Sequence, residues 1–201
     1  MRASLEILEV TTDRWGDLEK LFGPRGACGG CWCMAWRIPP SQFKRQQGEG
    51  NRKALKKIIA RGEVPGLLAY KDGNPIGWVC AGPRERFSRL ANSKVLAPVD
   101  DQPVWSVVCF YIARGQRRTG IGSALLKAAG IFARDQGAKI LEGYPSPPKP
   151  GKQPDAFVWT GLEPMFEKAG FQVAVRRGEA GRGIWRLALT GKRSAKQRIR
   201  S

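Results

Sequence analysis

The chain has 201 residues, 42% hydrophobic and 26% charged, a balance typical of a globular domain and not of a disordered chain. It carries 35 Lys and Arg against 17 Asp and Glu, so its net charge of +18 points to polyanionic partners: nucleic acid, an anionic surface or a phosphate-rich small molecule. It has no apolar run of the ~20 residues that a membrane span needs, and its start does not resemble a secretory signal, so we expect a cytoplasmic protein.

The first half of the chain predicts a strand, three helices and a β-hairpin, separated by Gly and Pro clusters. In chain order these are a strand over 4–10, helices over 13–22, 41–47 and 51–61, and strands over 66–71 and 76–81. Asn51 is the expected cap of the third helix, and the Asp-Gly-Asn-Pro turn at 72–75 is a hairpin signal. We expect a loop over 23–40 and an irregular or briefly helical segment over 83–102.

The second half predicts a strand–helix–strand unit followed by a helix and two closing strands. These are a strand over 104–112, a helix over 119–136, a strand over 139–144, a proline-rich loop over 145–154, a helix over 162–169 and strands over 171–176 and 184–189. The strand–helix–strand unit requires a right-handed parallel crossover, whereas the other strands can pair antiparallel. The prediction is an α/β (α+β) fold: a mixed, mostly antiparallel sheet of six to seven strands, with a central parallel β-α-β unit and helices on both faces. Residues 1–190 are expected to form this domain, and residues 191–201 a basic, disordered tail.

Three of the five cysteines, Cys28, Cys31 and Cys33, form a C-x-x-C-x-C motif, and the chain has no histidine. The lack of histidine excludes a Ser-His-Asp triad, a Cys-His pair and a His-ligated metal. A zinc site built from these thiols and Cys80 or Cys109 is one alternative, but the second C-x-x-C that would make that signal strong is missing. We expect a reduced, partly buried loop and no metal.

Residues 112–123 combine a strand end, a short polar turn and a helix start with two glycines, Gly120 and Gly122. The first N–H groups of a helix lack internal partners and carry partial positive charge, and glycine lets a bulky anion approach them. Arg114, Arg117 and Arg118 add full positive charges. The segment therefore predicts a pyrophosphate cradle. In the alternative interpretation, the glycines only permit close packing of helix and strand.

Residues 105–123 resemble the acetyl-CoA-binding motif of the GNAT N-acetyltransferase superfamily, in which a strand ends in Val-x-Pro-x-x-Arg-Gly-x-Gly-x-Gly. The chain matches this pattern at Ile112, Arg117, Gly120, Ile121 and Gly122. It departs from the pattern at Arg114, where proline is usual, and at Arg118, where glycine is usual. The order of elements up to about residue 190 also resembles the superfamily's fold.

This resemblance implies acetyl transfer from acetyl-CoA to a primary amine, by direct attack in a ternary complex. Backbone groups of the motif strand would hold the pantetheine arm, one backbone N–H would polarise the thioester carbonyl, and the turn and helix start would hold the pyrophosphate. The residues expected to bind acetyl-CoA are Phe110, Tyr111, Ile112, Arg117, Arg118, Thr119, Gly120, Ile121, Gly122 and Ser123.

The acid–base residues follow less directly from the resemblance. Glu142, on the strand beside the motif strand, is the first candidate for the base that deprotonates the amine; a solvated or salt-bridged carboxylate is the alternative. The superfamily often uses a tyrosine to protonate the CoA thiolate, but that position is Phe166 here. Tyr144 is the substitute candidate, with ordinary packing as its alternative, and Cys109 is a weaker one.

The superfamily's acceptor wall is commonly formed by the first two helices and the loop between them. In this chain that wall would include Trp32, Trp36 and Arg37, together with Cys31 and Cys33. Tryptophan and arginine suit an aromatic or carboxylated acceptor. The alternative is a small hydrophobic core under a long loop.

Two other functions remain open at this stage. One is a basic nucleic-acid-binding protein without catalysis, suggested by the charge and by seven tryptophans. The other is a degenerate acetyl-CoA-binding sensor, suggested by Phe166. The acceptor is expected to be a small molecule or a protein, with no membrane partner, and the protein a monomer or homodimer.

Overall fold

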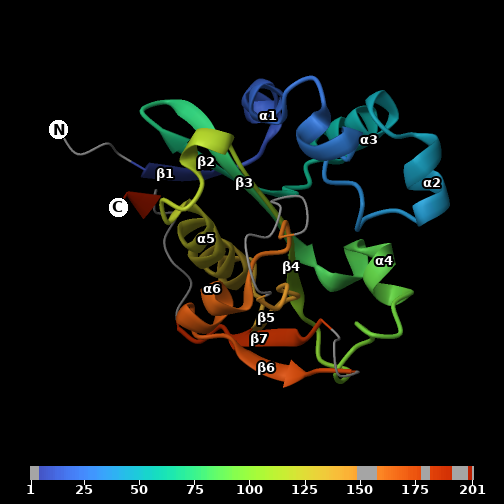
Figure 1. The fold of residues 1–201 in the computed structure, drawn as a ribbon, viewed down its shortest axis with the longest axis vertical. Coiled ribbons are helices and arrows are strands. Elements are labelled where there is room, and N and C mark those ends of the chain that lie inside the picture. The colour runs from blue at the N-terminus through green and yellow to red at the C-terminus, as the bar shows by residue number, and fades with distance from the viewer. Residues whose placement is uncertain (1–4, 149–157, 178–181, 192–198, 201) are drawn as a thin grey trace.

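The computed structural model describes residues 5–148, 158–177, 182–191 and 199–200, and its centre is a single sheet (Figure 1). The strands lie in the order β6-β7-β5-β4-β3-β2-β1-β8. They are β1 Leu5–Glu9, β2 Gly66–Lys71, β3 Asn74–Pro83, β4 Trp105–Ile112, β5 Ile140–Gly143, β6 Gln172–Val175, β7 Ile184–Ala188 and the two-residue β8 Ile199–Arg200.

All neighbouring strands run antiparallel except β4 and β5, which are parallel. This confirms the predicted mixed, mostly antiparallel sheet with a central parallel β-α-β unit. Seven strands, β1 to β7, form its body, and β8 pairs with β1 at one edge. The rest of the expected tail, residues 192–198 and 201, lies outside the described residues.

Helices cover both faces of the sheet, as predicted. They are α1 Trp15–Phe22, α2 Pro40–Arg45, α3 Glu49–Ala60, α4 Ser88–Ala91, α5 Ile121–Asp135 and α6 Glu163–Lys168. Because side chains alternate along a strand, neighbouring residues of β2 enter different cores. Leu68 joins the core under α1 and α3, whereas Leu67 joins the core under α5 and α6. In the described part of the chain, no helix is long and apolar enough to cross a membrane.

The prediction that Asn51 caps α3 is wrong, because the helix begins at Glu49 and Asn51 lies buried inside it. The Asn51 amide donates a hydrogen bond to the Gly30 carbonyl at 3.0 Å and accepts one from Gln46 at 3.0 Å. Asn51 therefore ties α3 to the cysteine-containing loop.

Trp32 packs the loop between α1 and α2 against the core. Trp32, at a positive φ of 42°, stacks on Trp15 with ring centroids 6.0 Å apart. Its indole also covers Gly26, where an added Cβ would lie 2.2 Å from the Trp32 ring nitrogen. The short turn Gly26–Gly30 therefore has room only for a glycine at its start.

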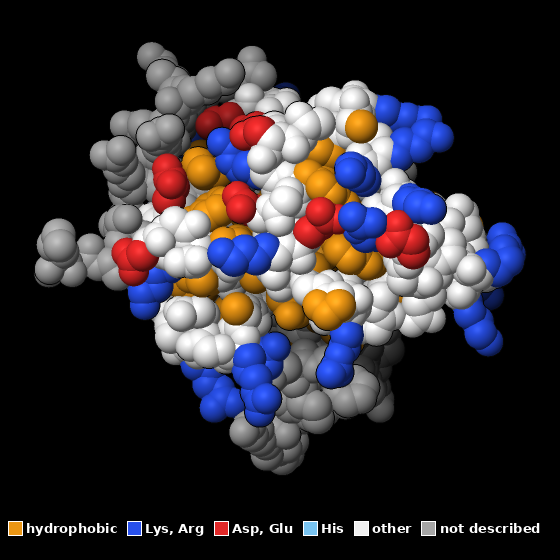
Figure 2. Space-filling view, turned by 90° about the horizontal axis from the view of Figure 1, so that it is seen from above, with side chains coloured by type: hydrophobic (Ala, Val, Ile, Leu, Met, Phe, Trp, Pro, Cys, Tyr) orange, Lys and Arg blue, Asp and Glu red, His pale blue; other side chains and the backbone are white. Residues whose placement is uncertain are grey.

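The surface charge is mixed on the face shown in Figure 2. There, Asp and Glu side chains are interspersed with Lys and Arg, and hydrophobic side chains lie between them. An extended nucleic-acid footprint would require basic side chains gathered on one face, which this view does not show.

Candidate active site

The central feature of the site is the separation of β4 from β5. The two strands pair only from Trp105 to Val107 on the β4 side, while β4 continues to Ile112. The register against β3 shifts at the same point, which marks a bulge that redirects the strand. The segment after residue 157 enters the opening, where the Phe110 N–H donates a 2.6 Å hydrogen bond to the Trp159 carbonyl.

The N-terminus of α5 begins at the far end of this opening. Its N-cap, Gly120, has a φ of +88°, a left-handed conformation that favours glycine. The Arg117 Nε donates to the Ile112 carbonyl at 3.0 Å, and the Thr119 hydroxyl donates to the Gln116 carbonyl at 2.7 Å. These bonds fix the turn that aims the helix start at the strand end.

A cavity of about 860 Å³ lies along this opening. Its wall is formed by β4, the start of α5, the cysteine-containing loop and the segment before α6. It includes these residues predicted to bind acetyl-CoA: Phe110, Tyr111, Ile112, Arg117, Arg118, Gly120, Gly122 and Ser123. Thr119 and Ile121 are not on the wall: the Thr119 hydroxyl closes the turn, and Ile121 packs in the core beside Gly77.

The chemistry of this wall fits a pyrophosphate-bearing cofactor. The N–H groups of the first turn of α5 have no partners within the helix, and the helix dipole adds partial positive charge. Arg117 and Arg118 line the same end of the cavity, and Gly120 leaves the backbone there open, because an added Cβ would meet nothing within 4 Å. The rest of the wall is mainly apolar.

Of the three residues predicted to bind the acceptor, only Trp36 lines the cavity. Trp32 stacks in the core beneath the loop. Arg37 is buried, forms a 2.7 Å ion pair with Glu63 and lies over the Phe87 ring. The expected roles of Trp32 and Arg37 therefore do not fit the geometry, because these side chains face the core.

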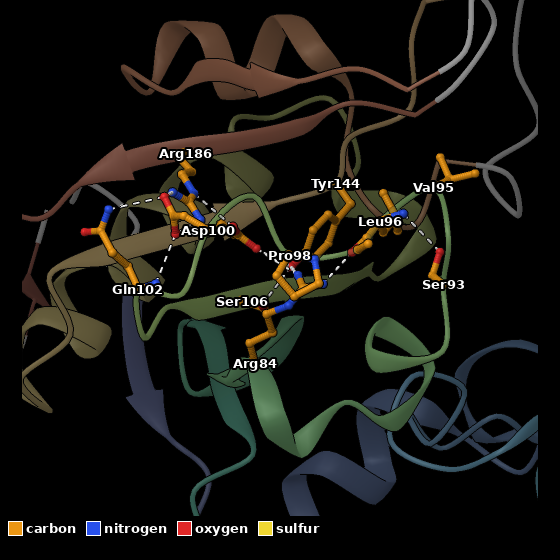
Figure 3. A network of polar contacts seen from close by, with 12 residues as sticks. Arg84, Ser93, Val95, Leu96, Pro98, Asp100, Gln102, Ser106, Tyr144 and Arg186 are labelled. Carbon is orange, nitrogen blue, oxygen red and sulfur yellow. Dashed lines mark hydrogen bonds and ion pairs between the residues drawn. The ribbon is translucent and has the colours of Figure 1, made fainter.

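Glu142 does not occupy the position of a general base. It is fully buried, lies off the cavity wall and forms ion pairs with Arg84 at 2.8 Å and with Arg186 at 2.9 Å. Arg186 also binds Asp100, whose pKa its hydrogen bond lowers to about 2 (Figure 3). Two guanidinium groups compensate the charge of Glu142, which favours the salt-bridged alternative raised by the sequence.

Tyr144 belongs to the same buried network (Figure 3). Its hydroxyl donates to Glu142 at 2.8 Å, accepts from Arg84 at 2.6 Å and lies 2.8 Å from the Ser106 hydroxyl. Burial, reinforced by the charge of Glu142, raises its pKa well above the ordinary value of a phenol. The predicted role of Tyr144 as a proton donor does not fit a hydroxyl that is sealed away from the cavity.

Phe166, at the position where the superfamily often has tyrosine, is fully buried. It packs edge-to-face on Phe171 and Phe110, and its ring covers Gly143. It therefore contributes to the core, and α6 lines the cavity through Pro164 and Met165 instead.

Several wall residues were not predicted from the sequence: Phe22, Trp78, Trp159 and Met165. Trp159 follows the proline-rich loop and has no motif around it, so only its contact with β4 reveals its place. Phe22 and Trp78 carry the periodicity of ordinary core residues, and nothing local distinguishes them.

The buried thiols cluster between the cavity and the core. The Trp78 indole N–H donates to the Cys33 sulfur at 3.1 Å, and Cys80 and Cys109 adjoin that sulfur. All five cysteines are unpaired. Within the described ranges, no group of three or more His, Cys, Asp or Glu residues is arranged to hold a metal ion.

Comparison with solved structures defines the class of fold. A PaiA N-acetyltransferase from Thermoplasma acidophilum in complex with coenzyme A is 15% identical, with 92% of this chain and 98% of that one covered and a TM-score of 0.53. A GNAT-family acetyltransferase from Streptococcus agalactiae is 12% identical, with 94% and 96% covered and a TM-score of 0.54. YncA from Salmonella typhimurium, a putative acetyltransferase with acetyl-CoA, is 13% identical, with 95% and 98% covered and a TM-score of 0.53.

The fold is thus that of the GNAT acetyltransferases. The model of the acetyltransferase (GNAT) family matches residues 32–145, more than half of the chain. The chain therefore belongs to the GNAT acetyltransferase family. Among curated protein sequences, none matches it.

Proposed function

We propose that this protein is an N-acetyltransferase, carried by residues 1–190, that transfers the acetyl group of acetyl-CoA to a primary amine in a ternary complex. The observation that supports it most is the placement of the α5 N-terminus and two arginines at one end of a cavity that follows the free edge of β4. Binding of a polyanionic cofactor at this site would also account for part of the protein's positive charge.

Ile112 supplies the backbone group that suits the thioester carbonyl best. The Ala113 N–H donates to Ile76 on β3, so the backbone groups of Phe110 and Ile112 face the opposite side, where β4 has separated from β5. The Phe110 N–H is already bonded to Trp159. The Ile112 N–H is therefore the donor we assign to the carbonyl oxygen, whose negative charge grows during attack.

Tyr111 replaces Tyr144 as the candidate proton donor for the departing thiolate. It is half-buried, lines the cavity and lies next to Ile112 on β4. Its ring packs edge-to-face on Phe22, with centroids 5.6 Å apart, and this contact holds the phenol in place.

The test is acetyl transfer to a panel of amines, with CoA and acetylated amine quantified by chromatography because the protein's own thiols would react with a thiol reagent. Ser123→Glu is the informative variant: a carboxylate in the first turn stabilises a helix but would repel a pyrophosphate. Gln136→Glu, an equal charge change at the exposed other end of α5, is its control.

We expect turnover by the wild type and by Gln136→Glu and its loss in Ser123→Glu. Acetyl-CoA binding without acetylation of any amine would support the sensor alternative. DNA or RNA binding with a steep salt dependence, together with no acetyl-CoA binding, would support the nucleic-acid alternative.

A further inference from the structure

The ionisable side chains on the described cavity wall include no carboxylate. They are four cysteines, Tyr111, Arg117 and Arg118. The chain has no histidine, and Glu142 lies off the wall, paired with two arginines. The described wall therefore offers neither a carboxylate or imidazole base nor an anion to bind a cationic acceptor.

The buried thiols do not fill this gap. Burial raises the pKa of Cys31, and the hydrogen bond with Cys109 raises that of Cys33. The hydrogen bond with Cys33 lowers the pKa of Cys109, but burial keeps it above the ordinary value. These three thiols are therefore protonated at neutral pH and are poor proton acceptors.

This wall opposes an alkylammonium acceptor in two ways. An amine with a lysine-like pKa of ~10.4 is neutral in roughly one molecule in a few thousand at pH 7, so it needs a base before it can attack. Its cation would also lose water to the described wall, which is mainly apolar and has no carboxylate to compensate the charge. A polyamine would meet the second difficulty more than once.

The same wall favours a flat aromatic acceptor. Trp36, Trp159 and Phe22 line it, and the Trp36 and Trp159 rings lie 5.6 Å apart. Aromatic surfaces of this kind bind a ring by burial and by edge-to-face or offset contacts. Cys31 and Ala35 add small side chains to the same wall.

We infer that the acceptor is an arylamine, an aromatic amine that is neutral at neutral pH because its nitrogen lone pair is delocalised into the ring. This inference rests on the proposed acetyl transfer. The neutral nitrogen attacks the thioester carbon, the C–N bond forms, and the C–S bond breaks with its electron pair leaving on the CoA sulfur. The nitrogen's extra proton is transferred to that sulfur, directly or through Tyr111 or water, which gives the N-aryl acetamide and CoA.

The experiment compares three acceptors with the wild-type protein and acetyl-CoA between pH 6 and 9. They are 4-methylaniline, 4-methylbenzylamine, which keeps the ring but is protonated at neutral pH, and spermidine. We expect kcat/KM to be highest for 4-methylaniline at pH 7 and independent of pH. For 4-methylbenzylamine it should rise about tenfold per pH unit below the amine's pKa, and spermidine should not react.

Other results separate the inference from the function on which it rests. Preferential acetylation of spermidine or 4-methylbenzylamine at pH 7 would overturn the arylamine assignment and leave the transferase function standing. An acidic limb in the 4-methylaniline profile would reveal a base in the enzyme and would also overturn the inference. Acetyl-CoA binding without product from any amine would overturn both.

A pair of variants tests whether the lack of a carboxylate on the described wall sets the selectivity. Ala35 is half-buried on the wall, so Ala35→Asp adds a carboxylate there, and Ala35→Asn adds an uncharged group of the same shape. Relative to Ala35→Asn, we expect Ala35→Asp to raise kcat/KM for 4-methylbenzylamine against 4-methylaniline by about tenfold. Equal selectivity in the two variants would overturn the claim that charge on the wall controls the choice of amine.

Discussion

At the scale of single residues, the hydroxyl of Tyr144 stabilises the fold through a hydrogen-bond network at the centre of the sheet. It lies within hydrogen-bond distance of the buried Glu142 and Ser106 and of the partly buried Arg84. Since Tyr144 donates its proton to Glu142, Ser106 must donate its own to Tyr144. The network therefore depends on that hydroxyl twice, as donor and as acceptor.

Removal of this hydroxyl should weaken the fold and spare the cofactor site. We predict that Tyr144→Phe lowers the free energy of unfolding by about 1–3 kcal/mol, because it removes the Tyr144 hydrogen bond from the buried Ser106 hydroxyl and one hydrogen bond each from Glu142 and Arg84. Acetyl-CoA affinity should change less than twofold, because Tyr144 is not on the cavity wall. Urea denaturation and calorimetric titration measure the two effects.

Tyr111→Phe is the matched control for that variant. It also removes one phenol hydroxyl, but from a half-buried position on the cavity wall. It should change stability by less than about 0.5 kcal/mol. Equal destabilisation by the two variants would contradict the role given to the Tyr144 network.

The role of a residue could be predicted from the sequence where it depends on backbone conformation. The motif predicts a glycine at the start of the helix, and Gly120 has the left-handed conformation that favours glycine there. The roles of Glu142, Trp32 and Arg37 depend on which face of a strand or loop turns inward, and on arginines far away in the sequence. No local pattern carries that information.

At the scale of elements, β5 and α6 meet through one close contact. An added Cβ at Gly143 would lie 2.0 Å from the Phe166 ring, a distance that real atoms do not tolerate. The glycine on β5 and the phenylalanine on α6 are therefore complementary. Phenylalanine at this position has a packing reason that is independent of catalysis.

A double-mutant cycle tests this contact. We predict that Gly143→Ala destabilises the protein by about 1–3 kcal/mol through overpacking. Phe166→Leu alone should also destabilise it. The free-energy loss of the double variant should be smaller than the sum of the two single losses, by about 1 kcal/mol or more, because the leucine leaves room for the added methyl group. Additive losses in chemical denaturation would show that the two residues are not in direct conflict.

Elements with their own turn or period were predictable, whereas those shaped by distant contacts were not. The hairpin of β2 and β3 and the β4-α5-β5 unit follow from local signals. The start of α3 was missed because Asn51, a good cap by residue type, is satisfied by the carbonyl of Gly30 instead. The entry of Trp159 beside β4 depends on where the sheet separates, which no single segment encodes.

At the scale of the whole molecule, the net charge of +18 and the fold suggest different partners when each is taken alone. Charge alone admits nucleic acid, whereas the fold and the α5 N-terminus favour a cofactor with a pyrophosphate. Binding of a cofactor at a defined site can be distinguished from binding to a diffuse positive surface, because only the first depends on particular residues.

The most direct test is calorimetric titration of acetyl-CoA, with ATP as a polyanion control, into the wild type, Ser123→Glu and Gln136→Glu at physiological salt. We predict that the wild type and Gln136→Glu bind acetyl-CoA equally and more tightly than ATP. Ser123→Glu should bind it at least about tenfold more weakly, a loss of roughly 1.4 kcal/mol. Equal affinities for acetyl-CoA and ATP, unchanged in Ser123→Glu, would contradict a cofactor site at the start of α5.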